Sequence, residues 1–149
     1  MKIEKQSNKI IVYSPQDFNV DQTLNCGQIF RYSIDGNRAV VYSKDKKAEL
    51  ITDVNGDITI YTDDVDYFYY FFDFETDYSV IKNKLKKDKL LKNAVDYGYG
   101  IRILNNDAFE MIVSFIISAN NNIPRIKKSI EYLCTHFGKN MGDYFAFPT

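Results

Sequence analysis

The chain has 149 residues, 45% of them hydrophobic and 15% aromatic, which suits one domain or two small ones with a real core. Its formal net charge is −1, so any nucleic-acid binding would need a local basic surface. Two cysteines without a CxxC pair and one histidine argue against a zinc site, a disulfide scaffold or a histidine-based catalytic triad.

The first half of the chain predicts strands separated by turns. Asp35-Gly36-Asn37 and Asn55-Gly56 are typical hairpin turns, and each joins two runs with strand-like composition. The pattern therefore predicts an antiparallel meander of roughly five strands, at residues 8–13, 28–34, 38–43, 46–53 and 57–62.

The middle of the chain predicts helices. Residues 63–73 begin with acidic side chains, as helices often do, and contain an uninterrupted aromatic run from Tyr67 to Phe72. This run could form a stacking platform for bases, but we favour core packing because exposed apolar patches of that size are rare. Further helices are expected at 77–86, beginning at Asp77, and at 90–97.

The only basic cluster lies in these two helices and the short connection between them. Its lysines either form a solvated helix face, which we favour, or contact phosphate groups. They are Lys82, Lys84, Lys86, Lys87, Lys89 and Lys92.

Residues 107–125 contain the most informative pattern. Asp107 is the expected N-cap of an apolar helix, with Glu110 as its capping-box partner, and the lack of further charge predicts burial on most sides. The helix ends at three consecutive asparagines, Asn120, Asn121 and Asn122. Pro124 and Arg125 then open a second helix that runs to Gly138. The turn thus presents three amides and a guanidinium on a rigid support, although asparagines also end helices for purely structural reasons.

Three segments together resemble the 8-oxoguanine DNA glycosylases of the helix-hairpin-helix superfamily. They are NCGQIFRY at 25–32, YGYGIRILNNDAFE at 97–110 and SFIISANNNIPRI at 114–126. The resemblance implies an α+β fold, in which residues 1–104 form an antiparallel sheet with flanking helices, similar to half of a TATA-binding-protein fold. Residues 105–149 would be the first helices of the helix-hairpin-helix glycosylase domain.

The resemblance also implies roles for individual residues. The oxidised guanine is flipped out of the duplex into a pocket. The carbonyl oxygen of Gly27 would accept a hydrogen bond from N7–H of the lesion, which normal guanine lacks. Asn120 would fill the vacated space and Arg125 would contact the unpaired cytosine, with Asn121 and Asn122 completing the DNA-binding turn. Leaving a buried acceptor unpaired costs about 1–3 kcal/mol, enough to discriminate between the two bases.

The family's hairpin motif, its nucleophilic lysine and its assisting aspartate are expected beyond Thr149. No catalytic residue can be assigned within the chain, and no metal or cofactor is expected. We therefore expect the 149-residue chain to be inactive alone, whereas the whole enzyme would act as glycosylase and apurinic-site lyase.

The expected partner is double-stranded DNA with 8-oxoguanine opposite cytosine, bound by a monomer of the full-length enzyme. No apolar run is long enough to span a membrane and no signal-peptide core is visible, so we expect an intracellular, soluble protein, cytoplasmic if bacterial. One alternative is a non-catalytic duplex-DNA-binding module of the same fold. Another is an unrelated α+β domain that binds a protein or small ligand through its aromatic cluster.

Overall fold

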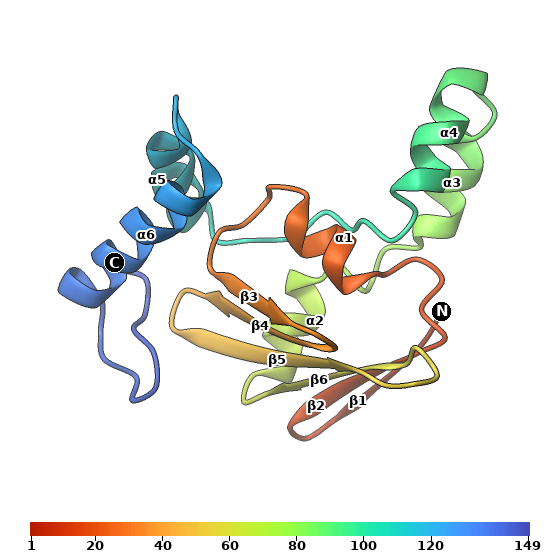
Figure 1. Ribbon diagram of the computed structural model, residues 1–149. Coiled ribbons are helices and arrows are strands. Elements are labelled where there is room, and N and C mark those ends of the chain that lie inside the picture. The colour runs from red at the N-terminus through yellow and green to blue at the C-terminus, as the bar shows by residue number, and fades with distance from the viewer.

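A computed structural model describes residues 1–149 and shows an antiparallel sheet with helices around it (Figure 1). The order across the sheet is β1-β2-β6-β5-β4-β3, so the β1–β2 hairpin adds to the edge of a four-stranded meander. The α+β fold with an antiparallel sheet is therefore confirmed. The strands are β1 (Lys2–Gln6), β2 (Lys9–Tyr13), β3 (Tyr32–Asp35), β4 (Arg38–Ser43), β5 (Lys46–Thr52) and β6 (Ile58–Thr62).

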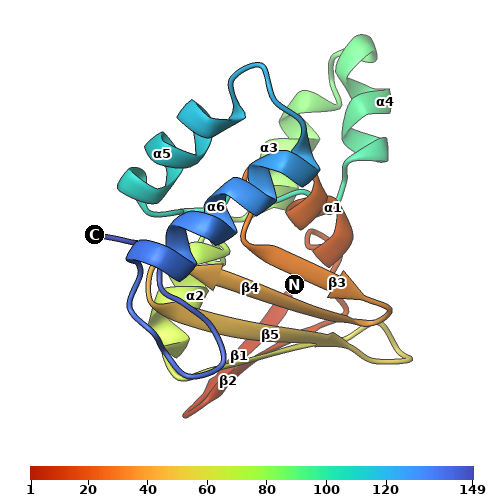
Figure 2. The same cartoon turned by 60° about the vertical axis from the view of Figure 1, so that its left-hand side comes forward.

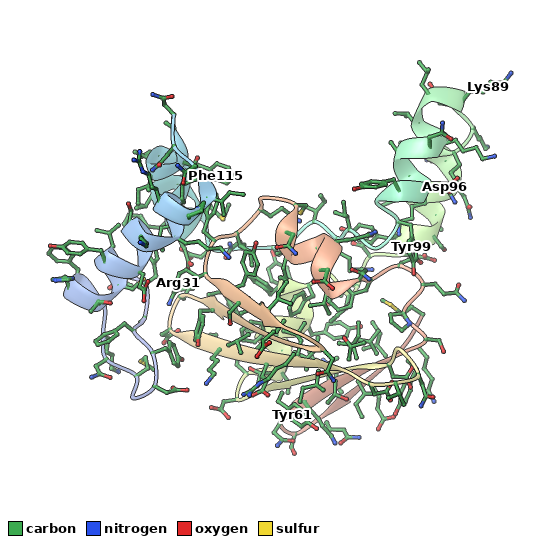
Figure 3. All side chains as sticks on the ribbon, in the orientation of Figure 1. Arg31, Tyr61, Lys89, Asp96, Tyr99 and Phe115 are labelled. Atoms are coloured by element: carbon green, nitrogen blue, oxygen red, sulfur yellow. The ribbon has the colours of Figure 1, made fainter.

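The buried face of the sheet packs against α1 (Val20–Asn25) and α2 (Val65–Phe71). Alternate strand residues enter a core of 17 buried residues, as expected for a sheet covered on one side. Phe68, Phe71 and Phe72 are fully buried in this core, so the aromatic run packs inside rather than forming a platform for bases. On the opposite face Tyr61 is 41% exposed, and Figure 3 shows it projecting below the sheet.

Every helix begins after an Asn or Asp whose side chain accepts a backbone N–H, which satisfies part of the unpaired first turn. Asn19 caps α1 and Asp64 caps α2. Asp77, Asp88, Asp107 and Asn122 cap the later helices, which are α3 (Tyr78–Leu85), α4 (Lys89–Tyr97), α5 (Ala108–Ser118) and α6 (Ile123–Phe137). None of these helices is both long and apolar enough to cross a membrane.

A turn at residues 98–100 and a segment without regular structure, residues 101–106, lead from α4 to α5 and are held by the buried side chain of Arg102. The guanidinium donates to the carbonyl oxygens of Phe72 at 2.8 Å, Thr76 at 2.9 Å and Asp17 at 3.2 Å, and also to that of Asp73. Burial lowers the pKa of Arg102. One side chain thus fixes the path along which the chain leaves the sheet.

The helices α5 and α6 form a second, smaller core. Ile126, Ile130 and Cys134 of α6 pack with Phe30 and Phe147. Figures 1 and 2 show the α5–α6 pair and the α3–α4 hairpin on the same side of the sheet as α1.

The structure corrects the expectation that α5 is buried on most sides. Its face towards the sheet, with Glu110 and Ser114, is buried, but Ile116 is 70% exposed. The reason is that α5 is packed mainly on α6, so only one of its sides has a neighbour within the chain. Other exposed apolar residues of α5 are Phe109, Ile112 and Phe115.

Two elements were missed, and one strand was expected to begin too early. The polar, edge-forming β1 and the six-residue α1 were not predicted, and residues 28–31 form a loop rather than the start of β3. The helix capping was only half as expected. The side chain of Asp107 accepts the N–H of Glu110 at 3.0 Å, but the Glu110 carboxylate turns away from the helix start.

Candidate nucleic-acid interface

The first part of the site is the loop from Cys26 to Arg31, between α1 and β3. Gly27 is exposed and has a φ of +88°, a backbone conformation that favours glycine, and no atom lies within 4 Å of where a Cβ would stand. The neighbouring Gln28 fixes the loop, because its side-chain amide donates to the carbonyl of Arg102 at 2.8 Å and accepts from the N–H of Leu104 at 2.8 Å. The loop therefore presents the Gly27 backbone to open space from a held position.

The second part is the turn between α5 and α6, where the structure separates the three asparagines by role. Asn121 donates from its side chain to the carbonyl of Ile117 at 3.1 Å. The side chain of Asn122 caps α6 by accepting from the N–H of Arg125 at 3.1 Å. Asn120 has a φ of +50° and is exposed, and no side-chain hydrogen bond within the chain uses its amide or the guanidinium of Arg125. Two amides build the turn, and one amide and one guanidinium are available to a partner.

The loop and the turn are joined by packing. Phe30 lies in the second core, and its ring meets the ring of Phe115 on α5 edge-on, with 6.1 Å between centroids. Figure 3 shows Phe115 on α5 above Arg31, at the end of the molecule where the α5–α6 pair stands. The Gly27 loop is thus tied to the two helices that carry the asparagine turn.

A buried ion pair completes this junction. Nη1 of Arg31 lies 3.3 Å from Oε1 of Glu110, and their side chains are 9% and 5% exposed. Arg31 also donates to the carbonyl of Phe145 at 2.7 Å, and Glu110 accepts the N–H of Lys44 at 2.7 Å. Burial raises the pKa of Glu110, and the nearby Arg31 opposes that shift. We call this arrangement the Arg31–Glu110 clamp.

The sequence motif that contains Arg31 indicates no role for this residue, and Glu110 was expected to serve only in helix capping. The missed signal is the shortage of other charged residues on α5, since a lone carboxylate on an apolar helix needs a cationic partner when it is buried. Gln28 was missed in the same way.

The residues expected to bind DNA lie outside the main hollows of the surface. None of the five main hollows in the surface is lined by Gly27, Asn120 or Arg125. No group of three or more His, Cys, Asp or Glu side chains is placed to hold a metal ion. Within this chain the site is an open surface formed by a loop and a turn.

Comparison with known proteins shows the relatives of this chain. Residues 10–112 match the family model described as 8-oxoguanine DNA glycosylase, N-terminal domain. An N-glycosylase/DNA lyase of Saccharomyces cerevisiae is 44% identical over 55 residues, which cover 34% of this chain and 15% of the yeast protein.

Solved structures of the Clostridium acetobutylicum 8-oxoguanine glycosylase/lyase are similar over nearly the whole chain. The apo-form has a TM-score of 0.86 at 38% identity and covers 99% of this chain. The complex with double-stranded DNA containing cytosine opposite 8-oxoguanine has a TM-score of 0.87 at 38% identity and covers all of it. This chain spans 54% of the length of each of those two structures. From the match of the family model and the shared fold, the chain belongs to the 8-oxoguanine DNA glycosylase family, whose N-terminal domain it contains.

Proposed function

We propose that this chain is the lesion-recognising N-terminal part of a DNA glycosylase and apurinic-site lyase that removes 8-oxoguanine from duplex DNA. The observation that carries the proposal is the junction of the Gly27 loop with the α5–α6 turn, on which the amide of Asn120 and the guanidinium of Arg125 are unused. A related structure with this fold holds duplex DNA containing cytosine opposite 8-oxoguanine, and we propose the same partner here.

In this proposal the exposed backbone of Gly27 reads the lesion. Its carbonyl oxygen accepts from N7–H of 8-oxoguanine, whereas the N7 of guanine is itself an acceptor and repels it. Asn120 occupies the space left by the flipped base, and Arg125 satisfies the edge of the unpaired cytosine with its fork of donors. Asn121 and Asn122 act through the shape of the turn, since their side chains already hold its backbone.

We also propose that residues 1–104 and 105–149 belong to two domains of a monomeric enzyme. Support comes from the two separate cores. The larger core lies within residues 10–104, and all residues of the smaller core except Phe30 come after residue 105. The catalytic lysine is then supplied by a further part of the polypeptide.

The proposal is tested with variants in the complete polypeptide that carries this chain. Asn120→Gly removes the amide but suits a φ of +50°, so it keeps the melting temperature while weakening binding to the lesion duplex. Arg125→Ala should reduce the preference for cytosine opposite the lesion by about tenfold to a hundredfold, the value of one base contact. Lys128→Ala, an exposed cation of the same helix, is the matched control.

Dissociation constants are measured for duplexes with 8-oxoguanine or guanine opposite each base. The wild-type protein should prefer 8-oxoguanine and the opposite cytosine. If both variants keep these two preferences unchanged, the asparagine turn has a purely structural role.

A further inference from the structure

The α3–α4 hairpin carries a positive charge that the rest of the molecule does not. Residues 82–96 contain six lysines and two aspartates, a net charge of +4, whereas the whole chain has a net charge of −1. Global charge therefore repels a polyanion weakly, and any electrostatic attraction must come from this hairpin or from another local surface.

Two of these lysines are engaged within the chain. Nζ of Lys82 lies 2.8 Å from a carboxylate oxygen of Asp17, with only 12% of its side chain exposed, and so anchors the base of the hairpin. Lys86 pairs with Asp96 at 2.5 Å, which joins α3 to α4. These two ion pairs account for the structural use of the cluster.

The other four lysines are exposed and have no carboxylate within ion-pair distance; they are Lys84, Lys87, Lys89 and Lys92. The nearby Asp88 is occupied, because its carboxylate caps α4 by accepting the N–H groups of Leu90 and Leu91. Figure 3 shows Lys89 at the far end of the hairpin, with its side chain pointing away from the body of the molecule.

Nothing in the core needs these lysines. α4 has no buried residue, and in α3 only Tyr78 is buried. In both views of the fold the hairpin rises from the same side of the sheet as the α5–α6 turn, and Figure 1 shows α1 between them (Figures 1 and 2). A long anion that lies on the turn can therefore extend towards the hairpin.

We propose that Lys84, Lys87, Lys89 and Lys92 form a second DNA contact, which binds the phosphate backbone of the duplex held by the α5–α6 turn. This rests on the proposed function and adds to it a sequence-independent contact. Ammonium groups on flexible stems bind phosphates as point charges and release counterions, so they supply affinity and salt dependence but no base discrimination.

The cations on the open face of the sheet are less suited to this role. Lys2 and Lys9 lie over the rings of Tyr13 and Tyr61, and Arg38 pairs with Glu49 at 2.6 Å. Lys5, on β1, pairs with Asp66 at 2.7 Å. These four cations provide a matched set of equal charge for comparison.

The test uses the complete polypeptide with Lys84→Gln, Lys87→Gln, Lys89→Gln and Lys92→Gln combined. Binding to a duplex is measured at several salt concentrations, and the slope of log K against log salt should decrease in magnitude by about 0.9 for each lost phosphate contact. The ratio of affinities for 8-oxoguanine and guanine duplexes should stay as in wild type. The melting temperature should also be unchanged, because the four side chains are exposed.

The control combines Lys2→Gln, Lys5→Gln, Lys9→Gln and Arg38→Gln, and should leave the slope close to the wild-type value. An unchanged slope in the hairpin variant, or an equal decrease in both variants, would overturn the proposal. The proposal would also be overturned if the hairpin variant lost salt dependence only in binding to phosphatidylserine vesicles and not in binding to the duplex. That result would make the hairpin a membrane-surface contact. A wild-type protein that does not prefer 8-oxoguanine contradicts the proposed function instead, and the slope comparison still decides the role of the hairpin.

Discussion

At Gly27 the backbone, and not the available space, opposes a side chain. With a φ of +88° and no atom within 4 Å of a Cβ, Gly27→Ala should lower the free energy of unfolding by about 1–2 kcal/mol through backbone strain alone. In the complete polypeptide the methyl group should also weaken the preference for 8-oxoguanine, because it lies beside the proposed reading carbonyl. Urea denaturation and duplex binding measure the two effects.

Gly142→Ala is the matched control for this prediction. Gly142 has a φ of +103° and equally open surroundings, but it lies in the loop after α6. It should lose similar stability and keep the wild-type lesion preference. A loss of preference in both variants would assign the effect to stability rather than to Gly27.

The Arg31–Glu110 clamp should give stability a particular dependence on pH. Because burial raises the pKa of Glu110 in the folded state, the folded protein holds its proton more tightly than the unfolded chain. The stability that Glu110 contributes should therefore fall as the pH rises from the ordinary pKa of a glutamate through the raised pKa of Glu110. Denaturation from pH ~4 to ~7 should show this fall in wild type, relative to Glu110→Gln. A relative rise over that range would mean that Arg31 outweighs the cost of burial.

At the scale of elements, turns and helix caps could be predicted from sequence, but burial only in part. The aromatic run was correctly expected in the core, whereas the exposed side of α5 was not expected. Asp35-Gly36-Asn37 placed one hairpin correctly, and the caps at Asp77 and Asp107 placed two helices. In β1 only the apolar Ile3 packs against the core, so no alternating pattern marks this edge strand. α1 is too short for a helical period, although Asn19 is a cap signal that could have revealed it.

The site was predictable only in part, for a related reason. Consecutive asparagines predict a turn, but the three-dimensional path of the turn decides which amide is left without a partner. The side chains of Asn121 and Asn122 both bond to the backbone of the turn. The exposure of one side of α5 could not be predicted for the same reason. An apolar pattern shows which residues favour burial but not whether a neighbouring element covers them.

Substitution of two isoleucines should show which side of the α5–α6 pair is covered and which is open. Ile130 is 1% exposed, so Ile130→Ala should lower the free energy of unfolding of this chain by about 2–5 kcal/mol through a cavity. Ile116→Ala, at a 70% exposed position, should change it by less than about 0.5 kcal/mol. Chemical denaturation of the two variants checks both values. A large loss at Ile116 would mean that α5 packs differently in solution.

At the scale of the whole molecule, the proposed function assigns recognition and chemistry to different parts of the polypeptide. The chain spans 54% of the length of the two solved relatives, and none of the five main hollows in its surface is lined by Gly27, Asn120 or Arg125. We predict that the 149 residues alone do not excise 8-oxoguanine. Incubation with a lesion duplex should give neither an alkali-labile product nor a borohydride-trapped adduct, while the complete polypeptide gives both. Either product from the chain alone would contradict this.

The clamp between Arg31 and Glu110 also has an evolutionary consequence. A guanidinium or a carboxylate left alone in this buried position would cost about 3–5 kcal/mol, whereas proteins often tolerate the exchange of a whole buried ion pair for apolar side chains of similar volume. Natural lineages should therefore keep both charges or exchange both together, and intermediates with one charge should be short-lived. Aligned homologues would then show covariation between two positions 79 residues apart.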